Sequence, residues 1–316
     1  MPRNISPGSL TPGFTRFGRS YGDTTYRTRV PIESGVTKRC VGVPTAKSPR
    51  ARLEAMDAFV SAEWVETAED IVLVDVRDAW EYDGIGHLPG AVNIPFDRFR
   101  SDEGEAGKLP PREEWEQLLS EAGISSEDTL VAYDDTQGVF AARFLVTALL
   151  LGHPEEKLHL LDGDFSAWQR DRATTSEAPD REQTNYESDA AAETPVVDFE
   201  TVSAFLPAVE AGDITLVDTR EEWEFEEGHL PGAVQLDWRE LVDEEKRGLR
   251  PEADLRTLLT SRKIPPERRT VLYCNTARRV SHTYLVLREL GYEQVELYEG
   301  SLAEWTDRGG DLVSES

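Results

Sequence analysis

The sequence predicts an α/β protein built from two similar domains, each with a mainly parallel sheet that helices cover. The first observation is a repeat, since residues 74–91 read VDVRDAWEYDGIGHLPGA and residues 217–233 read VDTREEWEFEEGHLPGA. The second is that short apolar runs alternate with stretches of helical period in each half, which is typical of parallel sheets buried on both faces. The third is the length of 316 residues, which suits two domains.

Each half contains three apolar runs that predict strands. They cover residues 71–75, 129–133 and 157–161 in the first half, and 214–218, 269–274 and 294–298 in the second. Between the last two strands of the second half, apolar residues at helical spacing predict a helix over residues 279–290. Gly291 follows as the residue that ends this helix in a left-handed conformation.

Composition divides the chain into four parts. Residues 1–55 hold ten Lys or Arg against three acidic residues and show no regular pattern, so we expect a disordered basic extension. We expect the first domain at residues 56–171, a polar linker at 172–195 and the second domain at 196–316. The extension lacks the apolar core of a secretory signal. A targeting or nucleic-acid-binding arm remains one alternative, and a tail without function, with translation starting at Met56, is the other.

The whole chain is strongly acidic. Its 61 acidic residues outnumber 34 basic ones, and its formal net charge is −27. Such a surface repels nucleic acid and anionic membranes, and no apolar run is long enough to span a bilayer. Because only six of the basic residues are lysine, the composition also suits a protein kept soluble in concentrated salt, and a halophilic source is our hypothesis.

The two cysteines, Cys40 and Cys274, lie in different contexts, and neither has a CxxC neighbour. With five scattered histidines, the sequence predicts no disulfide framework, no metal site and no organic cofactor. Thiol chemistry without paired cysteines suits the reducing cytoplasm. Cys274 closes a predicted strand, and reactive groups in such sheets collect at the carboxyl ends of strands. Cys274 is therefore a candidate nucleophile.

The loop that follows this cysteine favours a thiolate. It consists of Asn275, Thr276, Ala277, Arg278 and Arg279. Its backbone N–H groups would surround the sulfur, with the positive end of the next helix behind them, and both arginines add positive charge. We expect an ionised sulfur at the rim of the second half, open to solvent or facing the opposite half. An inert cysteine at a strand end is the alternative.

The first half lacks this chemistry. Its equivalent position is Asp134, and residues 135–139 bring no cation. We therefore expect the first half to be non-catalytic.

These motifs resemble the rhodanese superfamily, in the tandem form of thiosulfate and 3-mercaptopyruvate sulfurtransferases. The resemblance covers about residues 57–313. It rests on the D-x-R…GHLPGA element present twice, the cysteine loop present once, and the DG…W or EG…W ending of each half. It implies two tandem rhodanese-like domains, of which the second is catalytic.

The resemblance implies a two-step sulfur transfer. The Cys274 thiolate would attack the outer sulfur of a donor such as thiosulfate and hold it as a persulfide. Cyanide, a thiol or a protein cysteine would then accept the sulfur. The loop residues Asn275, Thr276 and Ala277 are implied to line the donor site.

The resemblance also implies roles for charged residues near the cysteine. Arg220 matches the family's substrate-binding arginine, and its planar fork suits an oxyanion. Arg278 and Arg279 are expected to supply the further positive charge that an anionic donor needs. Asp218 is expected to orient an arginine or loop amides, and His229 to fix a turn.

The identity of the donor stays open between thiosulfate and 3-mercaptopyruvate. Thr276 and Ala277 stand where the thiosulfate enzymes usually carry a basic residue and a glycine, and the loop does not match the mercaptopyruvate enzymes either. A cysteine phosphatase or arsenate reductase is a second candidate, but its C-x5-R loop is one residue longer than the loop from Cys274 to Arg279. A non-enzymatic scaffold or sulfur carrier is the third.

Overall fold

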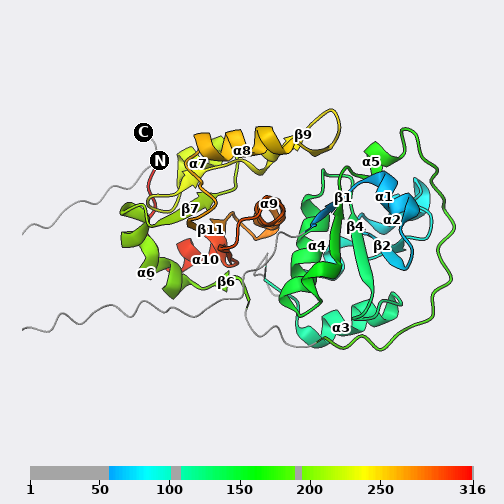
Figure 1. The fold of residues 1–316 in the computed structure, drawn as a ribbon. Coiled ribbons are helices and arrows are strands. Elements are labelled where there is room, and N and C mark those ends of the chain that lie inside the picture. Colours follow the sequence, from blue (N-terminus) through cyan, green and yellow to red (C-terminus); the bar gives the residue numbers. More distant parts are fainter. Residues whose placement is uncertain (1–56, 101–107, 189–193, 315–316) are drawn as a thin grey trace, which may run out of the picture. The chain divides into compact units, whose positions relative to one another are not determined.

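The computed structural model describes residues 57–100, 108–188 and 194–314 (Figure 1). The predicted extension at 1–55, with Cys40, lies outside these residues. Residues 50–316 form one compact unit that contains both halves of the repeat. In the part that the structure describes, no helix is long and apolar enough to cross a membrane.

The first half contains a five-stranded parallel sheet in the order β1-β5-β4-β2-β3. Its strands are β1 (Phe59–Val60), β2 (Ile71–Asp75), β3 (Val92–Asn93), β4 (Thr129–Tyr133) and β5 (Leu158–Leu161). Its α-helices are α1 (Ala62–Thr67), α2 (Ala79–Gly84), α3 (Arg112–Glu121), α4 (Val139–Leu150) and α5 (Phe165–Trp168). Short 3₁₀ turns lie at Phe96–Arg98 and Glu155–Lys157.

The second half repeats this arrangement, with a parallel sheet in the order β6-β12-β11-β7-β8. Its strands are β6 (Val196–Val197), β7 (Ile214–Asp218), β8 (Val234–Gln235), β11 (Arg269–Tyr273) and β12 (Val295–Tyr298). Its helices are α6 (Phe199–Glu210), α7 (Glu222–Glu227), α8 (Glu252–Ser261), α9 (Arg278–Glu289) and α10 (Ser301–Asp307), with a 3₁₀ turn at Trp238–Leu241. This half also contains the antiparallel hairpin of β9 (Val242–Asp243) and β10 (Gly248–Leu249).

The predicted fold class is confirmed. All six predicted strands are present to within one residue at either end, as β2, β4, β5, β7, β11 and β12. The predicted helix is α9, and Gly291 after it has a left-handed φ of +83°. The two-residue strands at the sheet edges were not predicted, because such short segments show no periodicity.

The two halves share a hydrophobic core. Helices α4 and α9 pack against each other, and one cluster of buried residues includes Phe144 of α4 and Leu285 of α9. Part of the predicted linker is also packed, since Tyr186 is buried and the N–H of Thr184 donates to the carbonyl of Ser120. The domain boundaries themselves stay predictions.

Candidate active site

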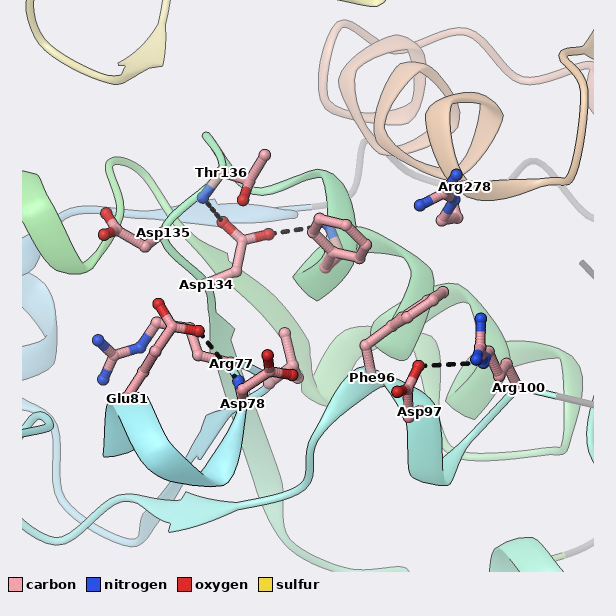
Figure 2. Close-up of a pocket in the computed structure, with 12 residues that line it drawn as sticks. Arg77, Asp78, Glu81, Phe96, Asp97, Arg100, Asp134, Asp135, Thr136 and Arg278 are labelled. Carbon is pink, nitrogen blue, oxygen red and sulfur yellow. Dashed lines mark hydrogen bonds and ion pairs between the residues drawn. The ribbon is translucent and has the colours of Figure 1, made fainter. Parts of the chain in front are cut away.

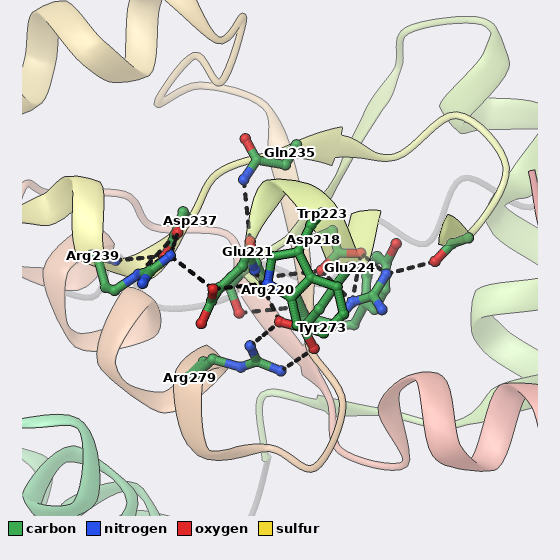
Figure 3. A network of polar contacts seen from close by, with 12 residues as sticks. Asp218, Arg220, Glu221, Trp223, Glu224, Gln235, Asp237, Arg239, Tyr273 and Arg279 are labelled. Carbon is green, nitrogen blue, oxygen red and sulfur yellow. Dashed lines mark hydrogen bonds and ion pairs between the residues drawn. The ribbon is translucent and has the colours of Figure 1, made fainter. Parts of the chain in front are cut away.

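An ion pair lies at the carboxyl end of β7. Nε of Arg220 donates to both carboxylate oxygens of Asp218 at 3.0 Å, and Nη2 bonds Oδ2 at 2.6 Å. Nη2 also donates to the carbonyl of Gly228 at 2.7 Å, and both side chains are buried. Burial acts to lower the pKa of Arg220, but the bonds and charge of Asp218 raise it overall. Asp218 thus orients Arg220, which ties the strand end to the turn after α7 (Figure 3).

The first half contains the same ion pair. Nη2 of Arg77 lies 2.6 Å from Oδ2 of Asp75 and 2.7 Å from the carbonyl of Gly86. Because this half has no cysteine, the pair has a structural role wherever it occurs. The copies differ in their surroundings, since the Arg77 guanidinium lies 3.6 Å from the ring centroid of Phe165 and its Nη1 is buried without a partner. Among the described residues Nη1 of Arg220 also makes no hydrogen bond, but it is not buried in this way, so it is the guanidinium atom left for a ligand.

His229 holds a turn. Its Nδ1 lies 2.9 Å from the carbonyl oxygen of Phe225, and its ring stacks on the Phe225 ring with centroids 3.7 Å apart. Its backbone N–H donates to the carbonyl of Val313 at 2.9 Å. This geometry supports the expected structural role.

Cys274 directly follows β11, and α9 begins four residues later at Arg278. Its exposed fraction is 1%, so the expectation that the sulfur is open to solvent is wrong in this structure. In the loop that follows, Ala277 takes a left-handed φ of +62° and is itself buried.

Arg279 is the cation that acts on the cysteine. Burial acts to lower its pKa, but the hydrogen bond with Glu224, the charge of Cys274 and further carboxylates raise it overall. Its Nη2 donates to Oε1 of Glu224 at 3.0 Å, and Nη1 bonds the other oxygen (Figure 3). The carboxylate of Glu224 therefore partly neutralises the positive charge of Arg279. Sequence reasoning missed Glu224, although Glu81 occupies the same position of the repeat.

Arg278 lies apart from Arg279 and reaches the first half. Its guanidinium lies 5.8 Å from the ring centroid of Phe96 and 5.5 Å from that of Phe140. It lines a cavity of about 420 Å³ whose other walls come from the first half, including Asp134 at a strand end (Figure 2). The structure thus separates the two arginines that the sequence placed together.

The equivalent loop of the first half holds an anion. The buried Asp134 carboxylate accepts hydrogen bonds of 2.7 to 3.0 Å from four backbone N–H groups, those of Thr136, Gly138, Phe140 and Ala141. Burial raises the pKa of Asp134, and the four hydrogen bonds oppose that shift. This loop is one residue longer, with residues 134–138 between strand and helix against 274–277. The strand–loop–helix frame of this fold therefore suits a negative group at its first position.

Comparison with known families identifies the fold. A model described as a rhodanese-like domain matches residues 61–171 and again residues 201–308. The chain belongs to the rhodanese-like family. The thiosulfate sulfurtransferase of Azotobacter vinelandii is 33% identical over 255 residues, which cover 76% of this chain and 89% of that relative. The enzyme of the same name from Pseudomonas aeruginosa is 32% identical over 251 residues, with coverage of 75% and 89%.

Solved rhodanese-like structures agree on the fold. SseA of Escherichia coli, a 3-mercaptopyruvate sulfotransferase, superposes with a TM-score of 0.68 at 24% identity and covers 77% of this chain and 98% of its own. Tum1 of Saccharomyces cerevisiae gives a TM-score of 0.70 at 21% identity, with coverage of 82% and 97%.

In the described ranges no group of three or more His, Cys, Asp or Glu side chains could hold a metal ion.

Proposed function

We propose that this rhodanese-like protein is a sulfurtransferase that carries sulfane sulfur on Cys274. The observation that carries the proposal is the position of Cys274, at the carboxyl end of a central strand and before the N-terminus of α9. Relatives named thiosulfate sulfurtransferase, at 32% and 33% identity, support thiosulfate as the donor. 3-Mercaptopyruvate is the second candidate donor.

The reaction takes place in two balanced steps. In the first, the Cys274 thiolate attacks the outer sulfur of thiosulfate, a new S–S bond forms, and the bond to the sulfonate sulfur breaks so that sulfite leaves with its electron pair. In the second, cyanide or a thiolate attacks the terminal sulfur of the persulfide, and the thiolate of Cys274 is regenerated. The net charge is the same on both sides of each step, and neither step needs an added oxidant or reductant.

Different residues around Cys274 are proposed to stabilise the negative charge of its sulfur and that of the donor. The loop amides of Asn275, Thr276 and Ala277 are proposed to stabilise the thiolate and persulfide, as the first-half loop stabilises the Asp134 carboxylate. Arg279 adds a full positive charge that interacts with Cys274. Nη1 of Arg220 and the exposed guanidinium of Arg278 are proposed to attract the donor's sulfonate oxygens.

Intact mass spectrometry tests the proposal directly. After incubation with thiosulfate and removal of excess donor, the protein should gain one sulfur atom, about 32 Da by atomic mass. Cyanide should then remove that mass and release thiocyanate. Cys274→Ser should gain nothing, whereas Cys40→Ser should behave as the unaltered protein. A mass gain that persists in Cys274→Ser, or no gain in the unaltered protein, would refute the assignment.

The composition supports two further proposals about the working environment. The persulfide and its thiol acceptors suit a reducing compartment, so we place the protein in the cytoplasm. The net charge of −27 suits concentrated salt, and activity should be retained or increase with KCl at molar concentrations. Activity that is highest in dilute buffer and falls steadily with KCl would argue against this adaptation.

A further inference from the structure

The turn after β12 holds the backbone of Cys274 at both of its polar groups. The N–H of Cys274 donates to Oγ of Ser301 at 3.2 Å, and its carbonyl accepts from the N–H of Leu302 at 3.0 Å. Oγ of Ser301 in turn donates to the carbonyl of Tyr298 at 2.9 Å. Ser301 is fully buried and has a left-handed φ of +51°, a conformation that a serine keeps only when its surroundings impose it.

An arginine from the other half binds the same turn. Arg143 lies in the middle of α4 with an exposed fraction of 4%, and its Nη2 donates to Oε1 of Glu299 at 2.9 Å. Glu299 is two residues before Ser301. A guanidinium this deeply buried is stable only with well-placed partners, so the bond fixes where the Glu299 carboxylate lies. The non-catalytic half thereby restrains the turn that holds the cysteine.

A second arginine makes a contact from the second half to the first, and this contact offers a control for the role of Arg143. Arg247, in the turn of the β9–β10 hairpin, donates through Nε to both carboxylate oxygens of Asp164 at 2.8 Å. Asp164 occupies in the first half the position that Ser301 occupies in the second, and the next residue, Phe165, binds the carbonyl of Asp134 at 2.8 Å. This arginine therefore ties the halves together in the same way, but beside a loop that has no cysteine.

We propose that Arg143 is a positioning residue for Cys274, acting through Glu299 and Ser301. The proposal rests on the proposed function of Cys274 and gives the first half a role in that function. Without the bond to Glu299, the turn is free to leave its left-handed conformation at Ser301, and the N–H of Cys274 loses its anchor. The sulfur then shifts relative to Arg279 and the N-terminus of α9. Displacements of this kind lower turnover more than they weaken donor binding.

The experiment compares Arg143→Met with Arg247→Met in a Cys40→Ser background. Turnover with thiosulfate and cyanide is measured alongside the rate at which iodoacetamide alkylates Cys274, read by intact mass. Arg143→Met should lower kcat by about tenfold or more with little change in the donor's KM, and should slow alkylation at pH 7 by about threefold or more. Arg247→Met should leave kcat and the alkylation rate unchanged. Urea unfolding of the two variants should show that each of them loses stability. Equal effects of the two variants on kcat and alkylation, or no effect of Arg143→Met, would overturn the proposal.

Two further variants keep the test decisive if Arg143→Met does not fold. Ser301→Gly relieves the left-handed strain and removes the hydroxyl, so it should fold well and still lose turnover and alkylation rate. Glu299→Gln should repeat the effect of Arg143→Met, and the double variant should be no worse than either single one. Full activity in Ser301→Gly would also overturn the proposal. Alkylation does not require sulfur transfer, so a protein that transfers no sulfur yet shows these alkylation differences would refute the proposed function and leave the positioning role standing.

Discussion

Replacement of Arg220 tests whether this residue binds the donor, because the first half supplies a copy of its ion pair. In Arg220→Ala the buried Asp218 carboxylate loses its partner, which costs about 3–5 kcal/mol of unfolding free energy. Arg77→Ala leaves Asp75 in the same position, with the same 2.6 and 2.7 Å contacts removed. The two variants should therefore lose similar stability.

Activity should distinguish the two variants. Nη1 of Arg220 has no hydrogen-bond partner among the described residues and is not fully enclosed, so it can give a donor one charge-assisted hydrogen bond, worth about 1.5–3 kcal/mol. Its loss corresponds to about a 10- to 150-fold fall in kcat/KM for thiosulfate. Arg77→Ala removes a guanidinium whose Nη1 is buried in the half without a cysteine, so kcat/KM should stay near that of the unaltered protein.

The assay varies thiosulfate at fixed cyanide, at a temperature well below the unfolding midpoint of either variant. Urea unfolding of the same samples checks that the stability losses match. If either alanine variant fails to fold, the pair Arg220→Lys and Arg77→Lys keeps the charge but not the two-pronged contact with the aspartate. Equal losses of kcat/KM in both halves would show that Arg220 acts only through the fold, and an unchanged value in Arg220→Ala would remove it from the donor site.

Three other residues and one alternative substrate give predictions of defined direction. Burial between Phe59 and Trp238 lowers the pKa of His282 to about 4. Because the unfolded chain takes up this proton near pH 6.5 and the folded chain does not, stability should be unaffected above pH 6.5. It should fall by about 3 kcal/mol in total as the pH drops to 4. Urea unfolding of His282→Leu at both pH values should lack this contribution, and parallel losses in the two proteins would contradict the reasoning. Asp134→Asn should lower stability by about 1–3 kcal/mol, because its amide cannot accept all four N–H groups, and should leave kcat unchanged. Glu224→Gln should lower the KM for thiosulfate severalfold, because Arg279 no longer shares its charge with a carboxylate; a higher KM would show that Glu224 is needed to place Arg279. The protein should not hydrolyse p-nitrophenyl phosphate, and turnover that depends on Cys274 would favour a phosphatase instead.

Much of the fold was predictable because its strands are buried on both faces. A strand such as β2 or β7 is a continuous apolar run, and such a run can be recognised in the sequence without knowing which strands pair with it. The edge strands β3 and β8 are two residues long, and their pairing depends on the central strands already being in place. No local pattern marks such segments.

The position of the cysteine was predictable from the sequence. The positions of the charged side chains around it were less predictable, because they depend on which other residues those side chains bind. The loop from Cys274 to Arg279 was found by its position after a strand. The different contacts of Arg278 and Arg279 were not predictable. Arg278 lies over aromatic rings of the first half, whereas Arg279 binds Glu224. Neighbouring residues at the start of a helix point in directions about 100° apart, so adjacency in sequence does not give the two arginines the same protein partners.

The sequence by itself determined the duplicated α/β fold, the single half with a cysteine and the place of that cysteine at a strand end, because strand periodicity and motif spacing are local properties of the chain. Only the tertiary structure decided that Cys274 is buried, that most contacts of Arg220 are taken up by Asp218 and Gly228, and that Arg143 of the other half reaches the turn beside the cysteine. Exposure and ion pairing depend on residues far apart in the chain, and these come together only when the two sheets and the α4–α9 contact have formed.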